Sequence, residues 1–317
     1  MSALVISLDF ELFWGVADSR TISSYRKNIE GALYAIPHIL KLFHRYEVKA
    51  TWATVGMLMC RDFEHWREIS PRLTPGYTRR TCSTYTLTDI VRSNQSLFFS
   101  RPTVSKILDT PGQELATHTY SHFYCREPGA SPEQFAADLE CAAFVGKDLG
   151  VAYKSIVFPR NQVKPEYLPV LRQAGIKVFR GNPSHALYAD GHVTPGGVAG
   201  RAVRFADSWV SLTGSHVSSP TYDDGLVNVR ASQFLRPYSQ KLGFLEKLRL
   251  HRIKSEMSKA AASNGVFHLW WHPHNFGLET EKNLHTLEEI LQHYCRLRDS
   301  NGMRSLAMQD FAKVKVV

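Results

Sequence analysis

Strand-like and helix-like segments alternate along most of this 317-residue chain, which limits the folds that it can adopt. The run from Ala3 to Leu8 is continuously apolar, as in a parallel strand that is buried on both faces. Lys27 to Tyr46 has apolar residues at a helical period, and Val48 to Val55 returns to strand-like composition. Because strands joined through a helix usually lie parallel, this opening segment predicts a parallel α/β architecture.

The alternation continues to the end of the chain. Further strands are predicted at Glu114 to Thr117, Tyr153 to Phe158, Lys177 to Arg180 and Val266 to Trp270. Further helices are predicted at Pro102 to Asp109, Ser131 to Leu149, Pro165 to Ala174, Leu242 to Ala262 and Thr280 to Arg298. The stretches 61–100 and 181–237 are irregular and are interpreted as loop insertions. We expect one domain, residues 1–317, without internal repeats.

Composition narrows the class of protein. Apolar residues make up 44% and charged residues 21%, as in an ordinary globular protein, and no run approaches the roughly 18 apolar residues that cross a bilayer. Without a basic leader, a cytoplasmic location is expected. The five cysteines form no Cys-x-x-Cys pair, which argues against a disulfide framework. The net charge of +9 suits an anionic partner, but no motif indicates nucleic acid.

Polar side chains stand directly after several of the predicted strands. They are Asp9, Glu11, His118, His122, Arg160 and His272. In a parallel barrel the loops after all strands converge on one face, so these distant groups would meet in one pocket. A doubly wound sheet would gather only those beside its switch point. This placement therefore favours a barrel.

His118 and His122 could bind a metal together with one carboxylate. Four residues is about one helical turn, so both imidazoles can project to one side. Two histidines and one carboxylate would leave a coordination position for water, which is typical of a catalytic zinc. Of Asp9 and Glu11, one would ligate the metal and the other would accept a proton.

Other residues after the strands could assist such chemistry. Arg160 could pair with the base carboxylate and hold it ionised. His272 could protonate a leaving amine or alkoxide. His274 is expected to support the site or to lie at the surface, and His268, inside an apolar strand, is predicted to be a hydrogen-bonded core residue. Aromatic residues such as Trp14 crowd the same loops and could stack on sugar rings, although cores use them too.

These motifs resemble those of the NodB-homology polysaccharide deacetylases, carbohydrate esterase family four. Ser7 to Glu11 resembles the family's first motif in its Asp-x-Asp/Glu variant, and Thr117 to His122 resembles its motif of the type His-Ser/Thr-x-x-His. Ala50 to Gly56 resembles the Ala-Thr-Phe-Phe stretch between them. The resemblance covers most of the chain, with the motifs in the same order.

The resemblance implies a distorted (β/α)-barrel with about seven parallel strands. It also implies a divalent metal, usually zinc, held by Glu11, His118 and His122. Asp9 would be the base and His272 the acid.

The remaining family motifs are matched less closely. Phe158 to Asn161 resembles the Arg-x-Pro motif but places a proline before Arg160. Trp271 to His274 resembles the ending of a variant subgroup, and Ala206 to Trp209 resembles a motif whose tryptophan lines the pocket of the acid. The residues predicted to bind substrate are Trp14, Tyr120, Trp209, Trp271 and His274.

The expected reaction is hydrolysis of an N-acetyl, or another short acyl, group on an amino sugar. The expected substrate is an intracellular nucleotide- or lipid-linked precursor of a surface polysaccharide. The basic helix from Lys241 to Ala262 could rest on the inner face of an anionic membrane, or could be a solvated barrel helix. Two other functions remain open: hydrolysis of another C–N bond, as in a cyclic ureide (allantoinase-like), and glycan binding without turnover.

Overall fold

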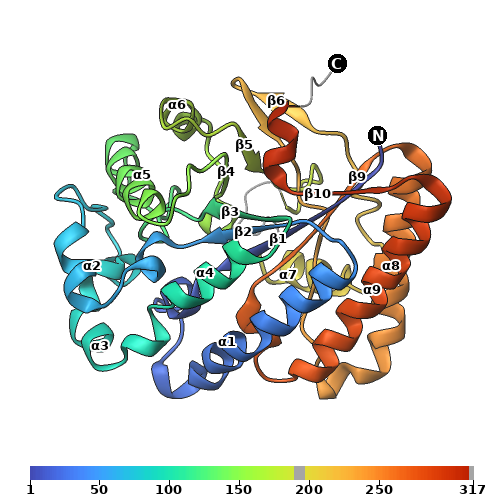
Figure 1. Ribbon diagram of the computed structural model, residues 1–317, viewed down its shortest axis with the longest axis horizontal. Helices are drawn as coiled ribbons and strands as arrows, with labels where there is room; N and C mark the ends of the chain where they lie inside the picture. Colours follow the sequence, from blue (N-terminus) through green and yellow to red (C-terminus); the bar gives the residue numbers. More distant parts are fainter. Residues whose placement is uncertain (189–196, 314–317) are drawn as a thin grey trace.

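The structure is a computed structural model that describes residues 1–188 and 197–313. Its centre is one curled sheet surrounded by helices (Figure 1). The strands are β1 (Ala3–Phe10), β2 (Ala50–Thr54), β3 (Gln113–Thr117), β4 (Ser155–Val157), β5 (Val178–Arg180), β6 (Thr221–Asp223), β7 (Leu226–Asn228), β8 (Gln233–Phe234), β9 (Val266–Trp271) and β10 (Arg304–Leu306). They follow the order β6-β7-β5-β4-β3-β2-β1-β9-β8, and β10 also pairs with β1. Within the described sheet, only β6 and β7 pair antiparallel.

The sheet curls because one short segment, residues 226–234, pairs with strands toward both ends of the strand order. β7 pairs with β5, and β8, which follows shortly after β7 in the chain, pairs with β9. Between them, the Ala231 N–H donates to the Gly181 carbonyl at 2.8 Å, and the Ser232 N–H donates to the His268 carbonyl at 2.8 Å. The expected fold class, a distorted (β/α)-barrel of mostly parallel strands, is confirmed.

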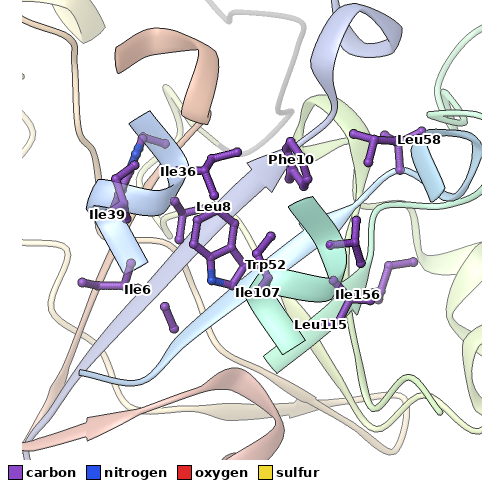
Figure 2. Packing of buried hydrophobic residues seen from close by; sticks show 14 of the residues in the cluster. Ile6, Leu8, Phe10, Ile36, Ile39, Trp52, Leu58, Ile107, Leu115 and Ile156 are labelled. Atoms are coloured by element: carbon purple, nitrogen blue, oxygen red, sulfur yellow. The ribbon is translucent and has the colours of Figure 1, made fainter. Parts of the chain in front are cut away.

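β1 is the central strand of this sheet. All eight of its residues are buried, and it pairs in parallel with β2, β9 and β10. Ile6 and Leu8 pack in one core cluster with Ile36, Ile39 and Trp52 (Figure 2). Burial of each large apolar side chain stabilises the fold by roughly 1.5–3 kcal/mol. The apolar run at the start of the sequence therefore anchors the strand that carries Asp9.

Helices cover the outside of the sheet (Figure 1). They are α1 (Ile22–Arg45), α2 (Phe63–Ile69), α3 (Thr88–Ser93), α4 (Arg101–Asp109), α5 (Pro132–Lys147), α6 (Leu168–Gln173), α7 (Gly197–Ala206), α8 (Glu246–Ser263) and α9 (Thr280–Asn301). α5 begins as its sequence predicts, because Ser131 and Gln134 form a capping box and Pro132 is the first helical residue. The predicted helices are thus present, with boundaries shifted by a few residues.

The two predicted insertions differ in structure. Residues 61–100 form α2, α3 and short 3-10 turns, without a strand. Residues 181–237 contain α7, β6, β7 and β8, apart from 189–196, which lie outside the described residues. The sequence pattern missed these strands because each has only two or three residues, too few for a hydrophobic period.

α8 is the basic helix for which membrane contact was considered. Several of its basic side chains pair within the fold: Arg252 with Asp207, Lys254 with Glu289, and Lys259 with Glu256. Much of its positive charge is therefore matched internally, and membrane contact stays a prediction. In the part of the chain that the structure describes, no helix combines the length and apolar character needed to cross a membrane.

Candidate active site

The predicted site residues that follow different strands meet at one cavity of about 610 Å³. This volume falls in the usual range of small-molecule sites, roughly 300–1,000 Å³. The residues of the predicted site that line the cavity are Asp9, Glu11, His122, Arg160, His272 and His274. They converge because the carboxyl ends of the parallel strands open at the same end of the curled sheet.

Glu11, His118 and His122 form a compact, buried cluster. The Glu11 Oε2 atom lies 3.0 Å from His122 Nε2 and 3.5 Å from His118 Nε2. One donor atom from each of the three residues lies within 4.8 Å of the others. The structure therefore brings together the three side chains that the family resemblance assigned to the metal.

A turn, and not a helix, brings the two histidines together. Thr119 and His122 have φ values of 63° and 58°, in the left-handed region that non-glycine residues rarely adopt. The Thr119 N–H donates to Thr117 Oγ1 at 3.0 Å, and the Phe123 N–H donates to Thr119 Oγ1 at 2.7 Å. The two imidazoles lie on the same side, as the four-residue spacing suggested, but a turn and not a helical face brings them together.

Asp138 of α5 fixes this turn from behind. Its buried carboxylate accepts hydrogen bonds from the Tyr120 N–H at 2.6 Å and the Ser121 N–H at 3.0 Å, and also from the Ser121 hydroxyl. Sequence reasoning missed this residue. The available signal was an acidic side chain on the otherwise apolar face of α5, next to Phe135 and Leu139.

The donor atoms of the cluster fit a divalent metal. His118 Nδ1 lies 2.8 Å from the Val157 carbonyl, so Nδ1 carries the proton and Nε2 presents its lone pair to the cluster. Within the described residues, this buried Nε2 atom has no hydrogen-bond partner. Two imidazoles and a carboxylate are a donor set typical of zinc and related ions. A bound ion would satisfy the Nε2 atom that the protein itself leaves unpaired.

Arg180, the last residue of β5, holds Asp9. Its Nη1 and Nη2 groups donate to Asp9 Oδ1 and Oδ2, both at 2.7 Å, and it also donates to Ser7 Oγ at 2.9 Å and to Asn161 Oδ1 at 2.8 Å. Burial raises the pKa of Asp9, but the Arg180 guanidinium and smaller contributions from nearby imidazoles together outweigh burial, so the pKa lies below its usual value. Asp9 is therefore ionised and fixed in orientation.

Glu11 is also held in its ionised form. Burial raises its pKa, but the imidazoles of His272, His122 and His118, which lie close to its two oxygens, hold the pKa well below its usual value. The two carboxylates thus share a preference for the charged state, although different partners impose it.

Arg160 does not have the partner that was predicted for it. It pairs with Asp18, and its guanidinium lies 4.4 Å from the centre of the Tyr124 ring, so the expected pairing with the base carboxylate is wrong. The reason is local, because Arg160 takes a φ of 54° in the turn after β4, and Asn161 is the residue of that turn that reaches Arg180. Arg160 still lines the cavity.

The sequence contained a signal for Arg180. It is a charged residue at the end of a predicted strand, the position that Asp9 and the residues after the other strands occupy. A search for charged residues at the end of every predicted strand would have selected Arg180 alongside Arg160.

His272 faces both carboxylates. Its Nε2 atom lies 3.8 Å from Asp9 Oδ2 and 3.7 Å from Glu11 Oε1, while Nδ1 lies 3.3 Å from Asn275 Oδ1. The side chain is 24% exposed, so a molecule in the cavity can reach it. Because Asn275 Oδ1 accepts a hydrogen bond from the Nδ1–H group in this arrangement, Nε2 is the nitrogen that is left to interact with a substrate.

His274 lies behind His272, and their rings stack with centroids 4.9 Å apart. His274 Nδ1 is 3.9 Å from Glu11 Oε1, and burial lowers the pKa of His274 to about 3, which keeps it neutral. His268 is the hydrogen-bonded core residue that was expected, with Nε2 2.8 Å from Ser7 Oγ.

Three of the aromatic residues predicted to bind substrate belong instead to the core. Trp14 is buried and its indole N–H donates to the Phe98 carbonyl at 2.8 Å. Tyr120 is buried beside Cys60, and Trp271 is buried and stacked on Phe276. The prediction of sugar stacking by these three side chains is therefore wrong.

Strand geometry explains the error at Trp271. Neighbouring strand residues point to opposite faces, so when Trp271 packs outward, Trp270 points inward. Trp270 lines the cavity, 4.3 Å beneath the Arg180 guanidinium and 4.7 Å from the Phe234 ring. Trp209 is likewise buried and packs on Phe205, while its neighbour Ser208 lines the cavity in its place.

Comparisons with known proteins found similar structures, but no matching family model and no matching curated protein. The structure is similar to that of a polysaccharide deacetylase from Mycobacterium smegmatis, with a TM-score of 0.59 and 12% identity over 98% of this chain and 90% of that one.

Enzymes acting on other carbohydrates have similar structures. A GH57-type branching enzyme from Pyrococcus horikoshii matches with a TM-score of 0.58 and 11% identity over 100% of this chain and 71% of that one. The α-amylase AmyC from Thermotoga maritima matches with a TM-score of 0.58 and 12% identity over 100% of this chain and 75% of that one. This chain therefore shares the distorted (β/α)-barrel fold of a polysaccharide deacetylase and of GH57-type enzymes.

Proposed function

We propose that this protein is a metal-dependent hydrolase that removes an N-acetyl group, or another short acyl group, from an amino sugar. One observation carries the proposal. An ionised carboxylate, Asp9, lies beside a cluster of metal-binding donor atoms, and His272 Nε2 lies within 3.8 Å of both Asp9 and Glu11. These positions support the assignment of a base, a metal site and an acid around one small space.

Glu11, His118 and His122 would hold the metal, most suitably zinc. Such an ion supplies Lewis acidity, which polarises an amide carbonyl and lowers the pKa of water. Glu11 contributes the negative charge of the donor set, and the two imidazoles contribute neutral nitrogen donors. Asp138 keeps the turn between the histidines in place through its hydrogen bonds to Tyr120 and Ser121.

Asp9 and His272 would move the protons. As water adds to the amide carbon, Asp9 accepts one of its protons, and Arg180 keeps Asp9 oriented for that transfer. When the C–N bond breaks, His272 Nε2 gives a proton to the departing amine nitrogen. The products are the free acid and the amino sugar.

Glycoside hydrolysis is the alternative suggested by the GH57-type structures, and the site favours it less. Cleavage of a glycosidic bond commonly needs one carboxyl group that is protonated and donates to the leaving oxygen. Here both oxygens of Asp9 accept hydrogen bonds from Arg180, and Glu11 Oε2 faces two imidazoles. Both surroundings favour the ionised form, so neither carboxyl group is arranged to donate a proton.

The substrate proposed is a glycan, in the form of a nucleotide- or lipid-linked precursor of a surface polysaccharide. The inward face of Trp270 and the Phe234 ring give the cavity wall an apolar surface on which a sugar can stack. An intracellular site is supported by the cysteines, all five of which are free thiols.

Peripheral contact with an anionic membrane face is also part of this proposal. Phe244, just before α8, is 80% exposed and could enter a lipid interface. Flotation with anionic liposomes tests this part. Equal flotation of the wild type and Phe244→Ser, or none at all, would remove the membrane from the proposal.

The main test combines metal analysis with an assay of acetate release. We expect one divalent ion per chain and release of acetate from an acetylated amino-sugar donor. Asp9→Asn should lower kcat by roughly 100- to 10,000-fold, the usual contribution of a general base, with unchanged metal content. Arg45→Gln, a change at an exposed ion pair with Glu288, is the matched control.

Each alternative gives a different result in this assay. A metal-free protein with full turnover in Asp9→Asn would refute the mechanism. Hydrolysis of a cyclic ureide without acetate release would favour the non-sugar C–N hydrolase. Tight glycan binding without any turnover would favour the non-catalytic relative.

A further inference from the structure

A group of arginines lines part of the same cavity. Arg201 and Arg204 are on α7, and Arg236 follows β8. None of these residues belongs to a motif identified in the sequence, and none takes part in the proposed proton transfers. They do, however, lie on the wall of the cavity that holds Asp9.

Of the three arginines, Arg236 has the surroundings that most clearly indicate a bound ligand. Its side chain is half-buried, Nε donates to Ser208 Oγ at 2.5 Å, and the guanidinium lies 4.7 Å from the centre of the Phe205 ring. Within residues 1–188 and 197–313, no carboxylate forms an ion pair with it. Burial, together with the positive charges of Arg204 and Arg249, lowers the pKa of Arg236. Among the described residues, the guanidinium on this wall of the cavity therefore has no anionic partner.

Other buried arginines in this protein are matched by acids. Arg180 pairs with Asp9, and Arg252 pairs with Asp207 at 3.1 Å. Asp207, which lines the cavity, also accepts hydrogen bonds from the Tyr188 hydroxyl at 2.9 Å and from backbone N–H groups. The Asp207 carboxylate is therefore already paired with groups other than Arg236. Because a half-buried guanidinium without a counter-ion is costly, its retention here points to an anionic ligand.

The position of Arg236 relates this anion site to the proposed acid. The Arg236 guanidinium lies 5.9 Å from the centre of the Phe234 ring, and the His272 ring lies 5.9 Å from the same centre. A single aromatic ring therefore contacts both groups. A ligand that stacks on Phe234 could place one substituent at His272 and another at Arg236.

We infer that Arg236, with Arg204 and Arg201 beside it, binds a phosphate group joined to the amino sugar. The planar guanidinium suits phosphate, because it can donate two parallel hydrogen bonds to it. The identity of the sugar rests on the proposed function, whereas the anion site rests on Arg236 and its surroundings alone. The phosphate can come from a nucleoside diphosphate or from a polyprenyl phosphate.

Calorimetric titration of the metal-loaded Asp9→Asn protein tests this inference without turnover. The ligands are UDP-N-acetylglucosamine, a short-chain polyprenyl-phosphate derivative of the same sugar, and its uncharged methyl glycoside. Arg236→Gln should weaken binding of a phosphorylated sugar by about 10- to 100-fold, the effect of losing hydrogen bonds to a charged group. Binding of the methyl glycoside should not change.

Two further variants guard against a folding defect. Arg236→Lys keeps the charge and should recover part of the affinity, whereas Arg45→Gln removes an exposed arginine elsewhere and should have no effect. Thermal unfolding of each variant shows whether the fold is intact. Arg204→Gln should also weaken binding of the phosphorylated sugars, and it gives a second test at a different residue.

The outcomes separate the inference from the proposed function. The phosphorylated sugar that binds more tightly identifies the source of the phosphate. An equal affinity for all three sugars, or an Arg236→Gln effect that is the same for the methyl glycoside, would overturn the anion site. Phosphate-dependent binding in a protein whose wild type releases neither acetate nor another short-chain acid from acylated amino sugars would refute the deacylase and leave the anion site standing.

Discussion

The two ends of the cavity are built in different ways. The end that we propose to be catalytic, called the catalytic end, consists of Asp9, Glu11, His118, His122 and His272. The arginine end consists of Arg201, Arg204 and Arg236. Most side chains of the catalytic end are fully buried and come from the ends of strands, where another residue fixes each one, as Arg180 fixes Asp9. Side chains of the arginine end are more exposed and come from α7 and the segment after β8.

This difference teaches how chemistry and ligand choice are divided in the fold. At the catalytic end, charged groups are desolvated, so each depends on its partner and a lost partner costs stability as well as activity. At the arginine end, solvent and ligand can replace each other around the guanidinium groups. Substitutions at the catalytic end should therefore affect folding and chemistry together, and those at the arginine end should affect ligand binding.

Arg180→Met should give the largest loss of stability. It removes the only ion-pair partner that the described structure gives Asp9 among its arginines and lysines, leaving a buried carboxylate uncompensated. The free energy of unfolding should fall by about 3–5 kcal/mol, measured by urea denaturation. Arg236→Met should cost less than about 1 kcal/mol in the same experiment. Equal losses of unfolding free energy in the two variants would contradict the proposed difference between the two ends of the cavity.

His118→Ala should give the largest loss of metal affinity. The variant removes the imidazole whose Nε2 atom is unpaired, and the Kd for zinc should rise by at least about 100-fold in competition with a chromogenic chelator. His285→Ala, at a side chain 72% exposed, is the control. Unchanged zinc binding in His118→Ala would remove the cluster from the metal assignment.

Asp138→Asn should have an intermediate effect at the catalytic end. Asparagine can accept from only one of the two N–H groups, at Tyr120 and Ser121, that the carboxylate now satisfies. We expect a loss of about 1–3 kcal/mol in stability and roughly 10- to 100-fold in zinc affinity, because the turn between the histidines loosens. A normal zinc Kd in a destabilised variant would show that the turn does not need this support.

Trp270→Ala should have the smallest effect, confined to sugar binding. Loss of the inward-facing ring should raise KM by roughly 2- to 10-fold with little change in kcat. Trp14→Phe, in the core, should leave KM unchanged while lowering thermal stability, because the buried Phe98 carbonyl loses the indole N–H that donates to it. A higher KM in Trp14→Phe alone would restore the original assignment of Trp14 to the substrate.

Much of the barrel could be predicted from the sequence because its long elements have clear periods. The strand at Ala3 to Phe10 and the helix at Ile22 to Arg45 each follow their hydrophobic pattern over many residues. β7 and β8 could not be predicted, because they have three and two residues and their pairing depends on β5 and β9, which lie elsewhere in the chain.

The residues of the site likewise divide into those that the sequence could predict and those that it could not. Glu11, His118 and His122 could be proposed from short motifs because their type and spacing already suggest metal ligands. The choice of Arg180 over Arg160 could not, since both follow strands and only the turn at Arg160 sends that side chain toward Asp18. Asp138 and Arg236 belong to no motif, and their importance depends on what lies next to them in the fold.

The sequence by itself determined which chemical groups stand at the ends of strands, and so a parallel barrel with two carboxylates and several histidines at one end. The tertiary structure decided which of these groups touch, which aromatic rings face the cavity, and that Arg236 forms no ion pair among the described residues. The physical reason is that hydrophobic period and residue type are local properties. Ion pairing and burial, by contrast, are set by neighbours that are distant in the chain.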